Sequence, residues 1–515
     1  MGVKTFAAIT VGSYELSMKI FEFSGKDKVK CIDHVRHNIE LGTDTYETGK
    51  ISFERVDELC RVLREFAAIC KTYRVDAYKA YGTSAIREMD NRVVVLDQIR
   101  GRTGIQIDVL SNSEQRYMDY KSLATIGDVF SSVIKRGTAV VDIGGGSIQI
   151  SLFDKDTLIT TQNMKLGILR MKEQLNKMNL KSAGYEEVAR ELVESNLNTF
   201  KKLFLRDREI DTLVVVDDYI SEIVSKNMRG EESEYQMSQE MFEAFYKRFR
   251  NKTAHETAQY FDYEEEKVPL LFLSSILVRS MMQVMEVKNL YVPGVSLCDG
   301  IAYEYAEKAH LIHPKHDFEQ DIIACAKNIS ERYRGSKKQA ETIWKIASSI
   351  FDTMKKIHRM GKREKLILQI ATILHDCGKY INLANDGECA YNIIMATEII
   401  GLSHMERELV ANIVRYTKSE LPSFDEISQE LDLEQKDYLT IAKCSAILRV
   451  SRGLMRSHKQ KYKEIRTKLE GNLLHIYLSS EADIQLEIGF IQKHLLYFEE
   501  VYSIQPVIHN KTIQK

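Results

Sequence analysis

The chain has 515 residues, of which 44% are hydrophobic and 28% charged, and a formal net charge of −2 at pH 7. This length and hydrophobic content suffice for about two to four domains, each with its own core. A net charge this small excludes a general attraction to nucleic acid or to an anionic membrane, so any site for a polyanion must be local.

The eight cysteines are scattered without a CxxC pair and lie mostly in apolar helical surroundings. Such cysteines are typical of free thiols in a reducing compartment. We find no apolar run that approaches the ~18 residues needed to span a membrane. We therefore expect a cytoplasmic protein with no membrane and no nucleic-acid partner, and a homodimer is left open.

The chain begins with a predicted β-hairpin, which consists of an apolar strand, a turn at Gly12 and Ser13, and a second strand of alternating pattern. A third strand follows the hairpin. Apolar residues at helical spacing over residues 53–73 then predict a crossover helix.

The next two strand-to-helix junctions carry residues that suit phosphate chemistry. Arg87 lies one turn into a helix after the strand 76–81, where it could bind a phosphate with two hydrogen bonds. A surface ion pair is the other interpretation, and these residues alone favour it. Glu114 follows the strand 105–110, where it could cap the next helix or act as a general base at the carboxyl end of the strand.

Three consecutive glycines starting at Gly144 separate two runs of β-branched and apolar residues, 138–143 and 148–153. This pattern predicts a tight hairpin whose backbone N–H groups can cradle phosphate oxygens. Asp142 can hold a hydrated Mg²⁺ against the same phosphate, and Ser147 can add a hydroxyl donor. A plain hairpin with a glycine turn would have the same sequence.

The second hairpin repeats the layout of the first, including a third strand that ends in a Leu-Gly pair. An internal duplication at such a long period indicates two similar lobes rather than a solenoid. We therefore expect an α/β fold with two actin-like (ASKHA, ribonuclease H-like) lobes, 1–127 and 128–307. Superposing the hairpins sets Thr10 of the first lobe against Asp142 of the second.

The rest of the chain is predicted to be mostly helical. Residues 318–455 show helical patterns throughout and include the pair His375-Asp376. Residues 456–515 are expected to form a small α/β cap, in which strands at 473–478 and 483–488 flank a helix.

Taken together, the glycine hairpins, the junctions at Arg87 and Glu114 and the helical domain resemble the exopolyphosphatase / guanosine pentaphosphate phosphohydrolase (Ppx/GppA) family, in its longer form with an HD-like domain. The resemblance covers essentially the whole chain. It implies cleavage of the terminal phosphate of inorganic polyphosphate, or of the 5′ γ-phosphate of pppGpp, with Mg²⁺ and an activated water.

The resemblance also implies roles for single residues. Glu114 matches the family's catalytic glutamate, Arg87 its phosphate-binding arginine, and Gly12 and Ser13 its first phosphate loop. The second phosphate and metal loop is matched by Asp142, Gly144, Gly145, Gly146 and Ser147.

The phosphate loops depart from the family pattern at several positions. Thr10 stands where the family has an aspartate, Gln149 where it has a glutamate, and Tyr14-Glu15 where it has Asn-Ser. Two carboxylates that would hold or orient Mg²⁺ are therefore missing. Since Mg²⁺ usually binds one or two carboxylates together with phosphate oxygens and water, Asp142 could still suffice. We expect a lower affinity for the metal.

The helical domain departs further. An HD phosphohydrolase needs a lone His, the His-Asp pair and a distant Asp as metal ligands, but Gln339 and Met455 occupy the first and last of these positions. Because neither side chain coordinates well, we expect no second metal centre and a structural role for His375 and Asp376.

Basic residues cluster in the same part of the chain, where they could follow a long polyanion or form solvated helix faces balanced by glutamates. They are Lys337, Lys338, Lys355, Lys356, Arg359, Lys362 and Arg363, and then Arg456, His458, Lys459, Lys461, Lys463 and Arg466.

Two hypotheses follow from the sequence. The first is an exopolyphosphatase-like phosphohydrolase that uses Mg²⁺ and a water activated by Glu114, with pppGpp as the alternative substrate. The basic clusters favour polyphosphate. The second is a regulatory protein that binds polyphosphate or a nucleotide and has lost efficient catalysis. Thr10 and Gln149 favour the second hypothesis, and Glu114 argues against it.

Overall fold

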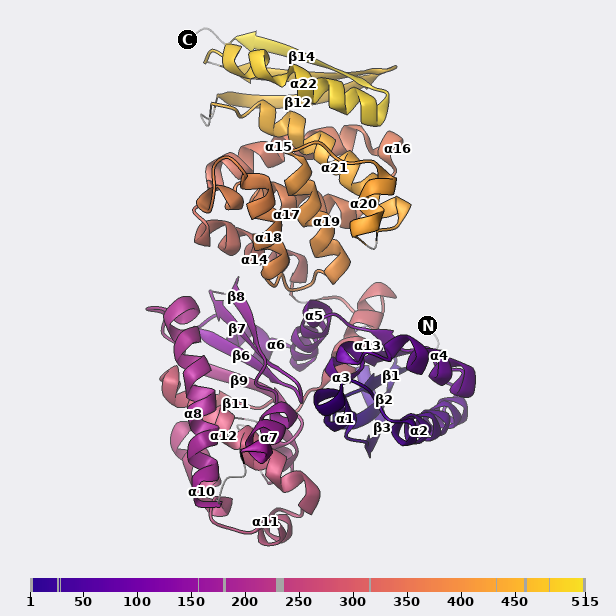
Figure 1. Cartoon of the computed structure of the whole chain (residues 1–515), viewed down its shortest axis with the longest axis vertical. Helices are drawn as coiled ribbons and strands as arrows, with labels where there is room; N and C mark the ends of the chain where they lie inside the picture. Colours follow the sequence, from indigo (N-terminus) through magenta and orange to yellow (C-terminus); the bar gives the residue numbers. More distant parts are fainter. Residues whose placement is uncertain are drawn as a thin grey trace. The chain divides into compact units, whose positions relative to one another are not determined.

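The structure is a computed structural model that describes residues 3–25, 27, 29–155, 157–178, 182–227, 236–314, 316–431, 433–457, 461–480 and 482–512. Figure 1 shows its elements in chain order. The chain divides into two compact units, Met1–Asp321 and Ile322–Lys515. We call them unit 1 and unit 2.

The first sheet of unit 1 has the strand order β3-β2-β1-β4-β5. In it, β1 pairs antiparallel with β2 and parallel with β4. The strands are β1 (Lys4–Val11), β2 (Glu15–Phe23), β3 (Val29–Asn38), β4 (Ala77–Gly82) and β5 (Asp108–Val109). The helices in this part of the chain are α1 (Leu41–Thr48), α2 (Phe53–Thr72), α3 (Ser84–Glu88), α4 (Arg92–Thr103) and α5 (Asn112–Leu123).

The second sheet has the order β10-β11-β9-β6-β7-β8. Its strands are β6 (Thr138–Ile143), β7 (Ile148–Asp154), β8 (Thr157–Met164), β9 (Thr212–Asp217), β10 (Gln236–Ser238) and β11 (Asn289–Tyr291). Its helices are α6 (Asp128–Val133), α7 (Ile168–Lys177), α8 (Ser182–Phe200), α9 (Ile220–Asn227), α10 (Gln239–Phe249), α11 (Ala254–Phe261) and α12 (Val268–Val284).

The two sheets share one topology, because β3-β2-β1-β4 corresponds to β8-β7-β6-β9 with the same parallel and antiparallel pairings. The duplication inferred from the glycine hairpins is therefore confirmed. Unit 1 consists of two actin-like lobes.

Successive side chains of β1 point to opposite faces of the first sheet, and both faces are covered. Ala7, Ile9 and Val11 lie in the core with α2. Phe6 and Ala8 lie on the other face, in a cluster with α13 (Leu297–Lys308). The sequence-based division places α13 in the second lobe, but by packing it belongs to the first sheet, because it buries the face of β1 that α2 leaves open.

α12 is an apolar helix in the core of the second lobe. By length and composition alone, the segment Glu265–Val284 could cross a membrane, which differs from the expectation that no run of this length is present. However, 72% of its most apolar window is buried inside the structure, and Leu270, Leu271 and Leu273 have no exposed surface. This burial is that of a core helix.

Unit 2 combines a helical region with a three-stranded sheet. The helical region begins within α14 (Phe318–Arg332), whose first turn belongs to unit 1. It continues with α15 (Lys337–Thr353), α16 (Lys355–His358), α17 (Lys362–Leu374), α18 (Asp386–Ala396), α19 (His404–Tyr416), α20 (Phe424–Glu430) and α21 (Gln435–Gly453). The sheet has the order β12-β13-β14. Its elements are β12 (Tyr462–Glu470), β13 (Leu473–Ser480), α22 (Gln485–Tyr502) and β14 (Gln505–Thr512).

One predicted strand of the cap is wrong. The segment 483–488 reads as an alternating strand, but α22 begins at Gln485, and the third strand of the sheet is β14. The side chain of Asp483 accepts a hydrogen bond of 2.9 Å from the backbone N–H of Gln485, which stabilises the start of the helix.

Candidate active site

A cavity of about 140 Å³ lies in unit 1, lined by residues of both lobes. Both glycine turns contribute to it, together with the carboxyl end of β9 and the first residues of α13. Among its lining residues are Thr10, Gly12, Ser13, Glu15, His34, Arg36, Thr83, Ser84, Gln115, Asp119, Asp142, Gly144, Gly145, Asp217, Asp218, Lys267 and Ser296. Open α/β folds place their chemistry at this end of the sheet.

The two glycine turns have the same internal geometry. The N–H of Gly12 donates to the carbonyl of Glu15 at 2.9 Å, and the N–H of Gly144 donates to the carbonyl of Ser147 at 3.0 Å. A Cβ atom on Gly145 would lie 2.9 Å from the Cβ of Ser13. The turns therefore touch one another across the two lobes, and the close approach requires a glycine at position 145.

Hydroxyl groups connect the first turn to the neighbouring elements. Ser13 Oγ lies 2.9 Å from Tyr46 Oη and 3.0 Å from Ser84 Oγ. The guanidinium of Arg170 lies 4.5 Å from the centre of the Tyr46 ring, and its Nε donates to the carbonyl of Gly146 at 2.9 Å. Tyr46 is thereby held between both turns.

Buried carboxyl groups are the main electrostatic feature of the cavity. Asp142 and Asp119 both line the cavity, and each acts on the pKa of the other. Burial raises the pKa of Asp142 to about 6, and the charge of Asp218 adds to this effect. The pKa of Asp119 is raised well above its usual value by burial and by its neighbour Asp142. Both carboxyl groups therefore hold a proton more tightly in the folded protein than in the unfolded chain.

Two further acids line the cavity but have other partners. The carboxylate of Asp217 accepts hydrogen bonds from the N–H groups of Tyr219 (2.6 Å) and Ile220 (2.5 Å), so that it caps α9. Burial nevertheless raises the pKa of Asp217 to about 7. Burial also raises the pKa of Glu15 to about 7, and the Lys267 ammonium lies 3.6 Å from the Glu15 carboxylate.

The chemistry of these side chains fits a hard divalent cation. Mg²⁺ prefers carboxylate oxygens and keeps several waters. Asp119 Oδ2 is buried and has no hydrogen-bond partner in the described structure. A cation beside Asp142 and Asp119 would offset the cost of burying their negative charges, which is the main cause of their raised pKa values. Among the described residues, no group of three or more His, Cys, Asp or Glu side chains is arranged to hold a metal by itself.

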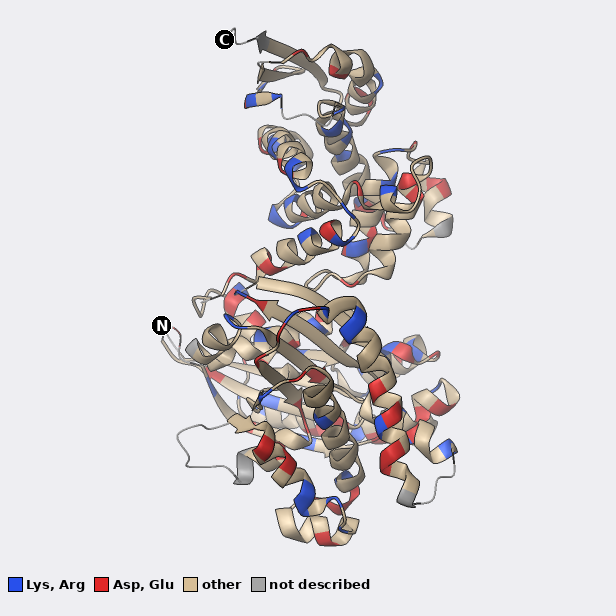
Figure 2. Cartoon of the chain, turned by 90° about the vertical axis from the view of Figure 1, so that its left-hand side faces the viewer, with Lys and Arg blue, Asp and Glu red and all other residues tan. Residues whose placement is uncertain are grey.

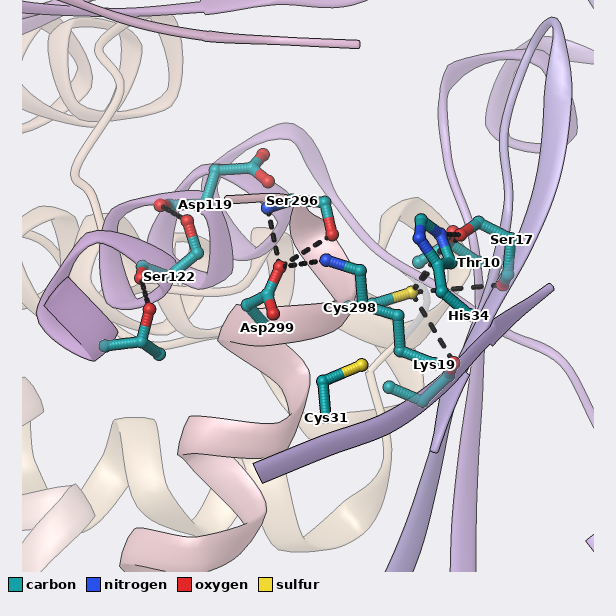
Figure 3. Close-up of polar contacts among 12 residues, drawn as sticks. Thr10, Ser17, Lys19, Cys31, His34, Asp119, Ser122, Ser296, Cys298 and Asp299 are labelled. Carbon is teal, nitrogen blue, oxygen red and sulfur yellow. Dashed lines mark hydrogen bonds and ion pairs between the residues drawn. The ribbon is translucent and has the colours of Figure 1, made fainter. Parts of the chain in front are cut away.

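Thr10 lies beside a buried ion pair that fixes the start of α13 (Figure 3). Its hydroxyl is 3.7 Å from Cys298 Sγ. The Lys19 ammonium lies 2.6 Å from Asp299 Oδ2, which also accepts hydrogen bonds of 2.8 Å from the backbone N–H and the hydroxyl of Ser296. Thr10 lines the cavity, as does Asp142, so the two positions matched by the repeat reach the same space.

The structure places other predicted residues outside the lining of the cavity. Glu114 forms a capping box, in which its carboxylate accepts the N–H of Ser111 at 2.9 Å. Arg87 donates from Nη1 to the carbonyl of Leu110 at 2.7 Å and to Gln115 Oε1 at 3.4 Å. Gln115 lines the cavity, so Arg87 is connected to it through one side chain.

In the second lobe, Gly146, Ser147 and Gln149 also lie outside the lining. The amide of Gln149 donates to Ser151 Oγ at 3.0 Å and to Thr161 Oγ1 at 2.8 Å, in a buried polar cluster of β7 and β8. A glutamate at this position would bring a charge into that cluster.

Sequence reasoning missed Asp119, Asp217 and Asp218, all of which line the cavity. Asp217 and Asp218 follow the last residues of a predicted parallel strand, and this position is a signal that could have been used. Asp119 carried no such signal, because a single aspartate within a polar helix is indistinguishable from a surface residue.

The pair His375-Asp376 is buried in unit 2. His375 Nδ1 is hydrogen-bonded to the carbonyl of Thr372 at 2.8 Å, and Lys379 lies 2.7 Å from the Asp376 carboxylate. Burial, together with the charges of Arg452 and Lys418, lowers the pKa of His375 to about 4, although the neighbouring Asp376 acts in the opposite direction. Nearby positive charge is unfavourable for a metal cation.

Several residues of the basic clusters have acidic partners. Lys461 pairs with Glu487 at 2.7 Å, Arg363 with Glu406 at 2.5 Å and Arg466 with Glu464 at 2.6 Å, whereas His458 and Lys459 lie outside the described residues. Figure 2 shows Lys and Arg interspersed with Asp and Glu over both units.

Comparison with known proteins gives relatives along most of the chain. A guanosine-5′-triphosphate,3′-diphosphate pyrophosphatase of Photobacterium profundum is 19% identical over 432 residues, which is 82% of each chain. Exopolyphosphatase 1 of Mycobacterium bovis is 24% identical over 143 residues, 28% of this chain and 40% of that protein. An exopolyphosphatase structure from Cytophaga hutchinsonii has a TM-score of 0.51 at 16% identity and covers 60% of this chain and 100% of its own.

Family models also match both units. The model of the Ppx/GppA phosphatase family matches residues 20–309, more than half of the 515 residues. The model of domain III of the Ppx/GppA phosphatases matches residues 323–499. The chain therefore belongs to the Ppx/GppA phosphatase family.

Proposed function

We propose that the protein hydrolyses a phosphoanhydride bond in the cavity of unit 1 and releases the terminal phosphate of inorganic polyphosphate. The observation that carries this proposal is the contact of the two glycine turns at a cavity that is also lined by Asp119 and Asp142. Backbone N–H groups and hydroxyls can bind phosphate oxygens, and the carboxyl groups can bind a cation that neutralises them.

In this proposal, Ser13 and the turns at Gly12 and Gly144 bind the terminal phosphoryl group. Asp142, with Asp119, would hold Mg²⁺, which when bound supplies positive charge to the phosphate oxygens in the transition state. Phosphoryl transfer depends mostly on such positioning and electrostatic stabilisation.

We propose, because of the family resemblance, that Glu114 is the general base that takes a proton from the attacking water. Its carboxylate already accepts the N–H of Ser111, and a carboxylate has further lone pairs for a water. Arg87 is proposed to bind the phosphate from the neighbouring helix. A phosphate there would compete with the carbonyl of Leu110 for the guanidinium.

The relatives are named for activity on both substrates, so they support the reaction class and leave the substrate open. We propose polyphosphate because a chain of phosphates needs no base-specific contact in the cavity, and pppGpp is the alternative. A binding protein without efficient turnover is the second candidate, because Thr10 removes a carboxylate from a cavity in which Mg²⁺ is proposed to bind.

Phosphate release from defined polyphosphate and from pppGpp, with Mg²⁺ and with a chelator, tests the proposal beside a direct binding measurement. We expect Mg²⁺-dependent release, faster from polyphosphate. Binding of either substrate without release above background would select the binding protein. Release from pppGpp alone would correct the substrate and keep the reaction class.

A further inference from the structure

Unit 2 contains a groove of about 440 Å³ between α15 and β12. These two elements pack side by side (Figure 1). The groove is lined by Thr342, Trp344, Lys345 and Ser348 from α15 and by Tyr462, Lys463 and Ile465 from β12. The volume falls in the range of roughly 300–1,000 Å³ that small-molecule sites occupy. The groove shares no lining residue with the cavity of unit 1.

Two aromatic side chains give the groove flat apolar surfaces. Trp344 is half-buried, so part of its indole is accessible. Tyr462 is also half-buried, and its hydroxyl donates to the carbonyl of Leu454 at 2.6 Å. Because this hydrogen bond fixes the phenol ring, Tyr462 forms a rigid wall. Accessible aromatic faces of this kind stack on planar rings.

The charged side chains that line the groove are both positive. Lys345 and Lys463 are both exposed lysines, and the described residues that line the groove include no carboxylate. In a chain of net charge −2, two ammonium groups beside two aromatic rings are a local arrangement that favours an anion with a planar ring.

The walls of the groove are held together before any ligand binds. The hydroxyls of Ser349 and Thr353 each lie 2.7 Å from the hydroxyl of Thr467. Thr467 also donates to the carbonyl of Ser349 at 2.9 Å. These bonds fix α15 against β12, so a ligand would not have to order the two elements.

We propose that this groove binds a nucleotide, whose base stacks on Trp344 and Tyr462 and whose phosphates are bound by Lys345 and Lys463. Lysines alone would attract any polyanion, including polyphosphate. The two aromatic rings provide the interaction that a polyphosphate chain cannot use. This inference does not rest on the proposed hydrolysis, and either can fail without the other.

Trp344 is the single tryptophan of the chain, so its fluorescence reports on this groove alone. The full-length protein is titrated with GDP, guanosine and pyrophosphate, with excitation at the red edge of tryptophan absorption, where bases absorb little. We expect saturable quenching by GDP, with an affinity at least about tenfold higher than that of guanosine or pyrophosphate, because each lacks one of the two recognised groups.

Variants that keep the tryptophan locate the binding. Lys345→Ala and Lys463→Ala should each weaken GDP by about tenfold. Lys345→Arg should retain most of the affinity. Lys436→Ala is the matched control, because Lys436 is exposed, pairs with Glu434 and does not line the groove. Trp344→Phe, followed by equilibrium dialysis with labelled GDP, should keep a reduced affinity.

Four outcomes would overturn the proposal. Equal quenching by pyrophosphate would show a plain anion site, and equal quenching by guanosine would show an apolar site. A single-stranded oligonucleotide that binds far more tightly than GDP would make the groove a nucleic-acid site. Absence of saturable quenching by all of these probes would show that the groove binds none of them.

Discussion

Asp119 from helix α5 of the first lobe and Asp142 from strand β6 of the second line the same cavity, and the pKa of each carboxyl group is raised. A raised pKa favours the protonated form of each acid, whereas a bound cation favours the ionised form. The protonation of this pair and the binding of Mg²⁺ should therefore oppose one another.

This relationship predicts a pH dependence of stability in metal-free buffer. The pKa of Asp142 is about 6 in the folded protein, against an ordinary value of 3.8, so the folded state holds this proton more tightly than the unfolded chain. The contribution to the free energy of unfolding is fully present below the ordinary pKa, and it is lost as the pH rises through about 6.

Denaturant unfolding of the wild type and of Asp142→Asn measures this contribution. We expect the wild type to lose about 1–3 kcal/mol relative to the variant across this pH range, and saturating Mg²⁺ to remove the difference. Parallel pH profiles of the two proteins in metal-free buffer would contradict the protonated pair.

Thr10→Asp should tighten Mg²⁺ binding, because Thr10 and Asp142 line the same cavity. The Mg²⁺ concentration for half-maximal activity should fall, whereas in metal-free buffer the added negative charge should weaken phosphate binding. Thr10→Asn is the matched control of similar shape without charge. A folding defect would instead weaken both Mg²⁺ binding and phosphate binding. If Thr10→Asp stays folded with an unchanged Mg²⁺ dependence, Thr10 does not face the metal.

Glu114→Gln separates a base from a helix cap. The amide keeps much of the capping box with Ser111 but cannot take a proton, so we expect a loss of about 10²- to 10⁴-fold in turnover with binding largely intact. Ser111→Ala is the control, because it removes a cap and leaves the carboxylate. It should cost about 1 kcal/mol of stability with near-normal turnover. Near-normal turnover in both variants would reduce Glu114 to a cap.

His375→Ala should affect stability rather than turnover. His375 is 1% exposed and hydrogen-bonded to Thr372, so its removal should cost about 1–3 kcal/mol. His404→Ala, at an exposed position, should change stability by less than about 0.5 kcal/mol. Elemental analysis of the purified protein should find no stoichiometric transition metal. One tightly bound Mn, Fe or Zn per chain would show that the pair does hold a metal.

The two-lobe fold could be predicted because it depends on local signals that occur twice. The turns at Gly12 and Gly144 have the sequence that tight hairpins require, and the strands around them have the expected length. Residues 483–488 were misleading because Ile484, Ile488 and Ile491 fit the spacing of a helix while the short run alternates like a strand.

The candidate site was only partly predictable, because its electrostatics arise from tertiary packing. Asp119 matters through its distance from Asp142, which lies in the other lobe, and no spacing along the sequence encodes that distance. Glu114 illustrates a second limit. The same Ser-Asn-Ser-Glu segment that suits a catalytic junction also forms a complete capping box, so the sequence supports both roles equally.

The most direct test of hydrolysis at this cavity compares phosphate release from polyphosphate by the wild type and by Asp142→Asn, both shown to be folded, with Mg²⁺ and with a chelator. The account predicts release by the wild type only with Mg²⁺, and a loss of about 10²-fold or more in the variant, the scale of removing one electrostatic group from an active site. Release that is unchanged in Asp142→Asn, or equal with the chelator, would contradict it.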